Sequence, residues 1–378
     1  MRNKRLKLCA LFLLAMLAPL MARAENPGNS PGPSEIKPPL GIPLDVWAYF
    51  IPKDSPLTPQ KVELGRKLFF DARLSADGRI SCATCHDPKF GFADSKPVAE
   101  GIGGRRGARN TPTILNAMFN ASQFWDGRAD SLDAQAVMPL INADEMGNRS
   151  LEEVVERIKR IAEYSGQFEE VFNRPVTIED VGKAIASYER TLVSGNSAFD
   201  RYIAGDRAAL SDSASRGLGL FRGKGRCSIC HNFNLSFPFL TDQNYRNTGI
   251  AANNPAFNDL TAAALQVART GATPERLAAL GKQKGAADLG RFLITGNALD
   301  IGAFRTPSLR NVELTAPYFH DGSAATLLDV VRYYARGGNE SPSRDWELHA
   351  VALTEAEQQD LVEFLKSLTG DEAKNGSR

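Results

Sequence analysis

Apolar residues recur at helical spacing along most of this 378-residue chain, and the alternation typical of β-strands is scarce. Residues 354–368 are the clearest case, because Thr354 and Glu357 form a capping-box pattern ahead of an apolar face. That face consists of Leu361, Phe364, Leu365 and Leu368. Two further predicted helices open in a similar way, at Thr177 with Asp180 and at Thr326 with Asp329. Long connections containing Gly and Pro separate such segments, so the pattern predicts a mainly α fold with long loops.

The first 24 residues are arranged as a secretory signal. A basic segment at residues 2–7 precedes an apolar run from Leu8 to Met21, and Ala22-Arg23-Ala24 resembles a small-x-small cleavage site. The run is short for a membrane span, and no later stretch approaches the required length. We therefore expect export to the periplasm, with no membrane span after the signal is removed. Cys9 lies within the signal, so cleavage leaves four cysteines.

Charge and composition narrow the classes of partner. The chain has a formal charge of +1, and the signal holds five basic and no acidic residues, so the mature chain has a formal charge of −4. A mildly acidic chain without basic runs argues against nucleic acid as a partner. Residues 25–45 are rich in Pro, Gly and Ser and are predicted to form a flexible leader. The remaining length of about 330 residues is enough for two domains.

All four remaining cysteines belong to two Cys-x-x-Cys-His motifs. The first consists of Cys82, Cys85 and His86, and the second of Cys227, Cys230 and His231. This spacing lets two thiols add to the vinyl groups of one haem while the histidine binds the iron as proximal ligand. The motifs therefore predict two covalently bound c-type haems.

Two other chemistries use paired cysteines. Disulfide bonds would not require a histidine after each pair. A zinc site would have to join cysteine pairs about 145 residues apart in the sequence, whereas such ligand pairs usually lie far closer. Both alternatives fit the pattern less well than haem attachment.

A longer pattern indicates internal duplication. Residues 111–127 and residues 306–322 share a Thr-Pro pair, an Asn and an aromatic-x-Asp-Gly segment at the same spacing. Trp125 in the first copy corresponds to His320 in the second, each 14 residues after its threonine. Because each copy follows one haem motif, we predict two cytochrome c-like haem domains related by duplication. The second copy carries an Ala-rich insertion, predicted within residues 251–295, whose composition favours surface helices.

The duplication also predicts unequal haems. Pro139 lies 14 residues beyond Trp125, and Tyr334 lies 14 residues beyond His320. If these positions are equivalent, each faces the sixth coordination position of its iron. Proline has no donor atom, so the first haem should stay open, whereas a tyrosine phenolate can bind iron and close the second. Alternatively, Tyr334 could simply pack as an aromatic residue of an amphipathic helix.

These motifs resemble the bacterial dihaem cytochrome c peroxidase family over nearly all of the mature chain. Besides the two haem motifs, the resemblance is carried by residues 124–128 (FWDGR), 305–311 (RTPSLRN) and 315–322 (TAPYFHDG). It implies a peroxidatic N-terminal haem domain at residues 46–205. It also implies a C-terminal electron-transfer haem domain at residues 206–370.

The resemblance implies roles for several residues near the first haem. Trp125 would lie between the two haems as an electron relay. Gln135, Pro139 and Glu145 follow Trp125 at the family's spacing and would form the distal pocket. Glu145 would be the general acid/base that moves a proton between the two peroxide oxygens, and Gln135 would orient peroxide or water. Without this context, Glu145 would be read as a solvated surface carboxylate.

The family also binds a calcium ion between its two units. The matching residues here are Asn110, through its side chain, and Thr315 and Pro317, through their backbone carbonyls. Oxygen ligands of this kind suit a hard cation. Of the other two histidines, His320 is expected to form hydrogen bonds near the second haem, and His349 is expected at the surface.

Two departures from the standard peroxidases resemble the MauG branch of the family. Residues 87–109 contain no histidine, so the distal ligand that must leave on reductive activation is missing and the first haem should be five-coordinate. Tyr334 replaces a methionine, which lowers the potential of the second haem. Tyr333 is a second possible ligand. The aromatic residue that MauG presents to its partner corresponds here to Gly225, which argues against the same protein substrate.

Three functions remain in competition. The leading hypothesis is a MauG-like oxidoreductase that uses hydrogen peroxide to form a high-valent state and oxidises a protein or redox partner. The second is a peroxidase that reduces hydrogen peroxide with electrons from a small cytochrome c or cupredoxin. The third is a non-enzymatic dihaem electron carrier, against which the open first haem argues.

Overall fold

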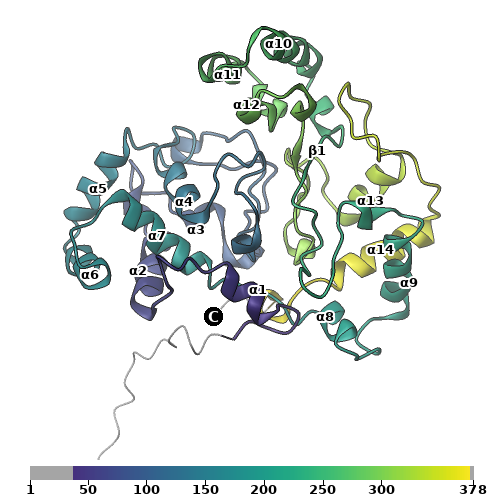
Figure 1. Cartoon of the computed structure of the whole chain (residues 1–378), viewed down its shortest axis with the longest axis horizontal. Coiled ribbons are helices and arrows are strands. Elements are labelled where there is room, and N and C mark those ends of the chain that lie inside the picture. Colours follow the sequence, from purple (N-terminus) through teal and green to yellow (C-terminus); the bar gives the residue numbers. More distant parts are fainter. Residues whose placement is uncertain (1–36, 375–378) are drawn as a thin grey trace, which may run out of the picture.

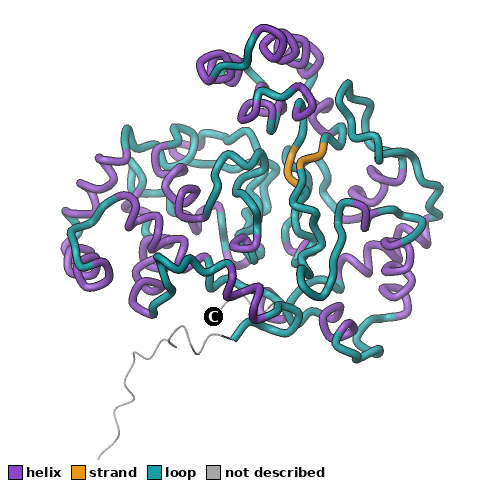
Figure 2. The backbone as a smooth tube through the Cα atoms, viewed as in Figure 1, coloured by secondary structure: helices purple, strands orange, loops and turns teal. Residues whose placement is uncertain are grey.

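The computed structural model describes residues 37–374 (Figure 1). The predicted signal at residues 1–24 and the first part of the predicted leader lie outside the described residues. Within the described part, fifteen α-helices are joined by long loops, and the only strands are two residues each. The prediction of a mainly α fold is confirmed. Loops fill the region between the helical groups, as Figure 2 shows.

The first group of helices, at the left of Figure 1, surrounds one hydrophobic cluster. Its members are α2 (Pro59–Phe70), α4 (Leu132–Ile141), α5 (Leu151–Lys159), α6 (Ala162–Phe172) and α7 (Ile178–Glu189). α7 is the central helix and contacts both α2 and α4. α2 approaches α7 closely at Gly65, where an added Cβ would lie 1.8 Å from the Ala184 carbonyl oxygen.

A second group at the right of Figure 1 has its own hydrophobic cluster. It contains α8 (Ala198–Ile203), α9 (Asp212–Arg222), α13 (Leu327–Ala335) and α14 (Glu355–Lys366). α9 crosses α14 at Gly217, where an added Cβ would lie 2.0 Å from the Asp360 carbonyl oxygen. The short α15 (Asp371–Lys374) ends the described chain.

The third group stands apart at the top of Figure 1 and corresponds to the predicted insertion. It contains α10 (Phe257–Thr270), α11 (Pro274–Gly281) and α12 (Phe292–Thr295). The antiparallel strands β1 (Tyr245–Arg246) and β2 (Phe304–Arg305) join the chain on either side of it. Trp125 packs against the hydrophobic cluster of this group, so the insertion covers a residue of the proposed relay.

Several local predictions can be compared with the structure. Thr354 and Thr326 form capping boxes with Glu357 and Asp329, and Thr177 caps α7, so all three predicted helix starts are confirmed. The leader was expected to extend to residue 45. Instead, α1 (Leu44–Tyr49) begins within that stretch.

Packing also changes the expected boundary between the two halves. Residues 198–203 form α8, which the sequence assigned to the N-terminal unit, but its Phe199 packs in the second cluster. A buried ion pair between Asp200 and Arg310, 2.8 Å apart, ties α8 to the second half of the chain. Among the described residues, no helix is long and apolar enough to cross a membrane.

Candidate haem sites

The first Cys-x-x-Cys-His motif is arranged to present a histidine nitrogen. Cys82–Cys85 form one helical turn, α3, whose start is capped by Ser81 and Thr84. The chain then leaves the helix at His86, whose ring Nδ1 lies 3.1 Å from the Phe92 carbonyl oxygen. Since a carbonyl only accepts, Nδ1 carries the proton and Nε2 is left as an electron-pair donor. Burial lowers the pKa of His86, which favours the neutral form that binds metals.

The second motif repeats this geometry. The backbone N–H of His231 donates to the Cys227 carbonyl at 2.9 Å, as that of His86 does to Cys82. His231 Nδ1 lies 2.9 Å from the Leu240 carbonyl oxygen, so its Nε2 is also free to bind. Burial lowers the pKa of this histidine too. Both motifs therefore offer a fixed, neutral imidazole, as a proximal iron ligand requires.

All four cysteines of the two motifs are free. Within residues 37–374, no three His, Cys, Asp or Glu side chains are grouped to hold a metal ion. Burial raises the pKa of Cys85 to about 11 and that of Cys227 to about 12, so both thiols carry their protons when no group is bound to them.

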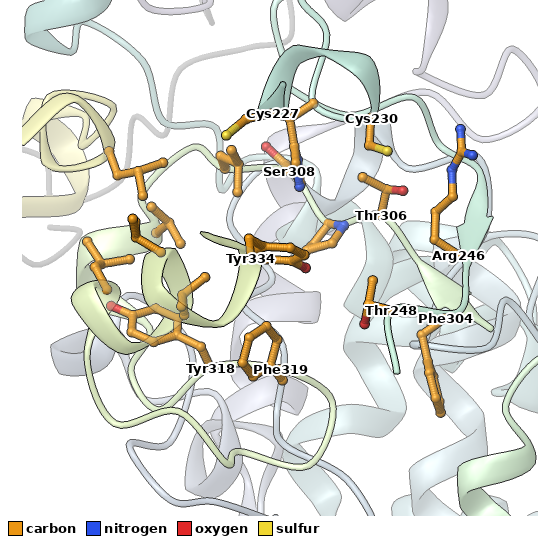
Figure 3. Close-up of a pocket in the computed structure, with 18 of the residues that line it drawn as sticks. Cys227, Cys230, Arg246, Thr248, Phe304, Thr306, Ser308, Tyr318, Phe319 and Tyr334 are labelled. Carbon is orange, nitrogen blue, oxygen red and sulfur yellow. The ribbon is translucent and has the colours of Figure 1, made fainter. Parts of the chain in front are cut away.

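A large cavity lies beneath the second motif, and Figure 3 shows its lining. Cys227, Cys230 and His231 form one wall, and Tyr334 projects into the space that they face. Most of the other lining side chains are apolar or aromatic, among them Tyr318 and Phe319. A flat apolar group held through two cysteines fits such a cavity.

Tyr334 and Tyr333 occupy different environments. Tyr334 lines the cavity, and burial raises the pKa of its phenol well above the ordinary value, so a bound cation would be needed to stabilise the phenolate. Tyr333 instead donates to the Thr248 carbonyl at 2.8 Å and accepts from the Asn339 N–H at 3.0 Å. The hydroxyl of Tyr333 thus holds a loop in place, which leaves Tyr334 as the available ligand.

A buried arginine side chain in the same cavity requires a negatively charged partner. Arg305 is 7% exposed and lines the cavity, yet its side-chain hydrogen bonds go to the Asn120 amide oxygen and the Phe124 carbonyl. Burial lowers its pKa to about 10. In the described part of the chain it forms no ion pair. A haem propionate would supply the missing negative charge, so Arg305 fits the cofactor that the cysteines predict.

The predicted distal residues lie at the end of α4 and in the loop after it. Gln135 and Pro139 are one helical turn apart on α4 and are half-buried. Glu145 follows in the loop, where its Oε1 accepts a hydrogen bond of 2.8 Å from Asn142. Burial raises the pKa of Glu145, with Arg128 acting in the opposite direction.

Glu145 lies close to the first haem motif. Its charge raises the pKa of the Cys82 and Cys85 thiols, beyond the larger effect of burial. The loop reaches this position by passing close to Gly101, where an added Cβ would lie 2.6 Å from the Glu145 Cα. The carboxyl group is therefore partly removed from water and close to the first site, as a general acid/base requires.

Trp125 lies at the second site. It lines the cavity of the second site, and its indole N–H donates to the Asn110 carbonyl at 2.8 Å. The N–H of Asn110 donates to the His320 carbonyl, also at 2.8 Å. The two residues that correspond in the sequence repeat are thus joined through the backbone of Asn110, and His320 lines the same cavity.

The residues predicted to bind calcium share the lining of one cavity. Asn110, Thr315 and Pro317 all line the cavity, although they are far apart in sequence. The amide N–H2 of Asn110 donates to the Lys96 carbonyl at 2.9 Å, which turns its amide oxygen away from that carbonyl. A calcium ion at these residues stays a prediction.

Three residues at these sites were not found by sequence reasoning. Glu189 is buried at the end of α7, Asp288 of the insertion accepts a hydrogen bond from His320 Nε2 at 3.1 Å, and Arg305 lies in the cavity. A signal existed for Glu189, because it lies on the apolar face of a predicted helix. Asp288 gave none, and Arg305 belongs to the RTPSLRN segment but had no role assigned to it, because both roles depend on contacts between residues distant in the sequence.

Known proteins that are similar to this chain belong to one family. A model of the dihaem cytochrome c peroxidase family matches residues 59–208. The chain is 39% identical over 324 residues to the methylamine utilization protein MauG of Methylorubrum extorquens, covering 85% of this chain and 82% of that protein. It is also 39% identical over 342 residues to a cytochrome-c peroxidase of Denitromonas iodatirespirans, covering 88% and 86%.

Solved structures give the same result for the fold. A MauG-like protein associated with microbial copper homeostasis is 30% identical and superposes with a TM-score of 0.70, covering 92% of this chain and 97% of the other. The dihaem peroxidase BthA of Burkholderia thailandensis is 25% identical with a TM-score of 0.66, covering 84% and 87%.

Proposed function

Because this chain belongs to the dihaem cytochrome c peroxidase and MauG family, we propose that it is a periplasmic enzyme of the MauG type. Membership makes it a haem-dependent peroxidase or oxidoreductase with two haems. Our proposal adds that hydrogen peroxide reacts at the first site, and that a protein partner supplies the electrons through the second.

The difference between the two sites carries the proposal. Tyr334 projects into the second cavity, opposite the wall formed by the second motif. Near the first motif lies Glu145, which offers a half-buried carboxyl group, and Pro139, on the helix before it, offers no donor atom. The absence of histidine from residues 87–109 removes the usual competing ligand. These observations support an open first haem and a closed second haem.

The residues of the first site can move the proton that peroxide cleavage requires. When bound, a haem supplies an iron atom that can take a peroxide oxygen and change its oxidation state. Glu145 would accept the proton of the inner peroxide oxygen at Oε2, because Oε1 is held by Asn142, and return it to the outer oxygen. Its raised pKa makes the return step easier at neutral pH. Gln135 would orient the peroxide by hydrogen bonding.

The electron balance requires a donor. Converting one hydrogen peroxide to two waters consumes two electrons and two protons, so a one-electron donor must act twice. Trp125 would connect the two sites. A carbonyl cannot take the indole proton, so the hydrogen bond to Asn110 would keep that proton on Trp125 when it loses an electron.

We also infer that the chain is a duplicated one-haem unit. The backbone of Asn116 and Asn311 is left-handed in both copies, with φ of 61° and 62°. Their N–H groups donate to Leu192 and Leu368 respectively, each just past a long helix of its own half. A calcium ion at Asn110, Thr315 and Pro317 would fix the two copies relative to each other.

The test of this function is the reaction of hydrogen peroxide with the ferric protein and its Glu145→Gln variant. We expect peroxide to change the Soret spectrum of the wild type rapidly. The variant cannot transfer the proton, so its second-order rate should fall by roughly 10²–10⁴-fold. Substitution of exposed Glu170 by Gln is the control. A wild-type spectrum that peroxide leaves unchanged would favour an electron carrier instead.

Steady-state measurements separate the two enzymes. Fast peroxide turnover by the protein as isolated, with a reduced small cytochrome c or cupredoxin as donor, would favour an ordinary peroxidase. The identity of 39% to both a MauG and a cytochrome-c peroxidase makes this comparison necessary.

A further inference from the structure

Glu189 is a buried carboxyl group to which the proposed reaction assigns no role. It is almost fully enclosed, and its Oε2 has no hydrogen-bond partner among the described residues. It is also the last residue of α7, where the negative end of the helix dipole disfavours a carboxylate. A buried polar atom without a partner is unfavourable, and in native proteins such an atom often marks a redox or catalytic role.

The charged groups that face Glu189 do not neutralise it. The guanidinium of Arg190 donates to both carboxylate oxygens of Asp133 on α4, at 3.1 and 2.9 Å. Arg190 and Asp133 therefore balance each other, and they shift the pKa of Glu189 in opposite directions. Lys61 of α2 lies near the same pair, but its ammonium group donates to the Pro56 carbonyl at 2.8 Å.

The end of α7 lies beside the first haem motif. After burial, the charge of Glu189 is the largest influence that raises the pKa of the Cys82 thiol, a group that no longer titrates once haem is attached to it. The ring of Tyr188 packs on that of Phe69, with centroids 5.2 Å apart, and Phe69 packs on Phe92 at 6.5 Å. The Phe92 carbonyl is the one that accepts from the proximal histidine. Glu189 is therefore close to the position of the first haem.

An acid in this position responds to the charge of the first haem. Reduction of a bound haem removes one positive charge, and a nearby carboxylic acid then holds its proton more tightly. One unit of charge changes a protonation equilibrium about tenfold at about 12 Å when the effective dielectric constant is about 20. By linkage, the proton makes the haem easier to reduce by the same factor.

We propose that Glu189 couples proton uptake to the arrival of an electron at the first haem. Its carboxylate takes one proton from water when the haem is reduced, and the carboxylic acid releases that proton when the haem is oxidised again. The proposal rests on the proposed function, in which two electrons and two protons convert one hydrogen peroxide to two waters. Glu145 has a different part, because it moves a proton between the peroxide oxygens and adds none. The pKa of Glu189, raised by burial to about 8, makes both of its forms accessible near neutral pH.

The test is the midpoint potential of the first haem in the holoprotein, measured by spectroelectrochemistry between about pH 6 and about pH 9.5. A tenfold change in proton affinity corresponds to about 59 mV, so the wild-type potential should fall by about this amount as pH rises. In Glu189→Gln this fall should be missing. Because Gln resembles the neutral acid, the two potentials should agree at the lowest pH and diverge as pH rises. Exposed Glu170→Gln, the control, should behave as wild type.

Two results would overturn the proposal. A difference between wild type and Glu189→Gln that is the same at every pH would reflect packing or polarity alone. An equal fall in the variant would show that another group, such as Glu145 or a haem propionate, is responsible.

Infrared difference spectra of the wild type at about pH 8 give a second test that does not depend on the folding of Glu189→Gln. Reduction of the first haem should add the band of a protonated carboxyl group, and Glu145→Gln should keep that band. A spectrum without it would contradict the proposal. The Soret response to peroxide at a single pH tests the proposed function separately, so failure of one can be distinguished from failure of the other.

Discussion

Glu189 is a carboxylic acid buried in the protein interior, where an ionised carboxylate is unfavourable. It is 5% exposed, and its Oε2 has no hydrogen-bond partner in the described part of the chain. Burial raises its pKa to about 8, against the opposing charge of Arg190. Its charge also raises the pKa of Cys82, so the carboxyl lies near the first haem motif. At neutral pH it should be largely protonated, which avoids a buried negative charge there.

Glu189 should make the stability of the protein depend on pH. Its pKa in the folded protein is above the value of about 4.3 expected for the unfolded chain. Its contribution is therefore complete below about pH 4.3 and is lost as pH rises through about 8, by at most about 1.4 kcal/mol per pH unit. In Glu189→Gln this loss should disappear. The free energy of unfolding of the variant relative to wild type should thus be higher at pH 9 than at pH 5 in urea titrations. An equal difference at both pH values would contradict this, and Glu170→Gln is the exposed control.

At the residue scale, the spacing of the repeat carried the information from which site residues could be predicted. The repeat distinguished Tyr334 from Tyr333, and only Tyr334 lines the cavity. It also paired Trp125 with His320, which the structure connects through Asn110. It could not identify Arg305, because a buried arginine without a carboxylate partner is recognised only when its surroundings are known.

At the scale of elements, glycines allow close helix crossings in both halves of the chain. Gly65 lets α2 approach α7, and Gly217 lets α9 approach α14. Gly65 lies in the helix that precedes the first haem motif, and Gly217 lies in the helix that precedes the second. Any side chain larger than hydrogen would force the helices apart.

Alanine at either glycine should disturb only its own half. Gly65→Ala and Gly217→Ala should each lower the free energy of unfolding by about 1–3 kcal/mol, because a Cβ meets backbone atoms. The matched controls are Gly166→Ala in α6 and Gly219→Ala in α9, where nothing lies within 4 Å. These should be neutral or stabilising by up to about 1 kcal/mol. Thermal unfolding and the spectrum of each haem would show the effects; a loss that is equal in the controls would contradict the close-crossing account.

Helix starts could be predicted from capping patterns, but the purpose of the inserted helices could not. Their Ala-rich composition predicted only that the inserted helices lie at the surface. The structure adds that Asp288 contacts His320 and that Arg291 donates to the carbonyls of Asp126 and Gly127, next to Trp125. These contacts join residues more than 30 positions apart, so no local pattern reveals them. The same limit applies to α8, whose packing partner α14 lies far along the chain.

At the scale of the whole molecule, Trp125 should determine whether the two sites act together. Peroxide added to the wild type should change the spectra of both haems. In Trp125→Phe, the first haem should still respond while the response of the second slows by at least about tenfold, because Phe is harder to oxidise and lacks the N–H bonded to Asn110. Stopped-flow spectroscopy of the two haem signals would measure this. Simultaneous responses in the variant would show that the sites communicate by another route.

The central claim is that the two haems differ because Tyr334 closes one and Pro139 leaves the other open. The most direct test is electron paramagnetic resonance of the ferric holoprotein beside its Tyr334→Met variant. We predict one high-spin and one low-spin signal in the wild type. In the variant the low-spin signal should shift and the potential of the second haem should rise, while the high-spin signal stays unchanged. A low-spin signal unaltered by this substitution, or two low-spin signals in the wild type, would contradict the account.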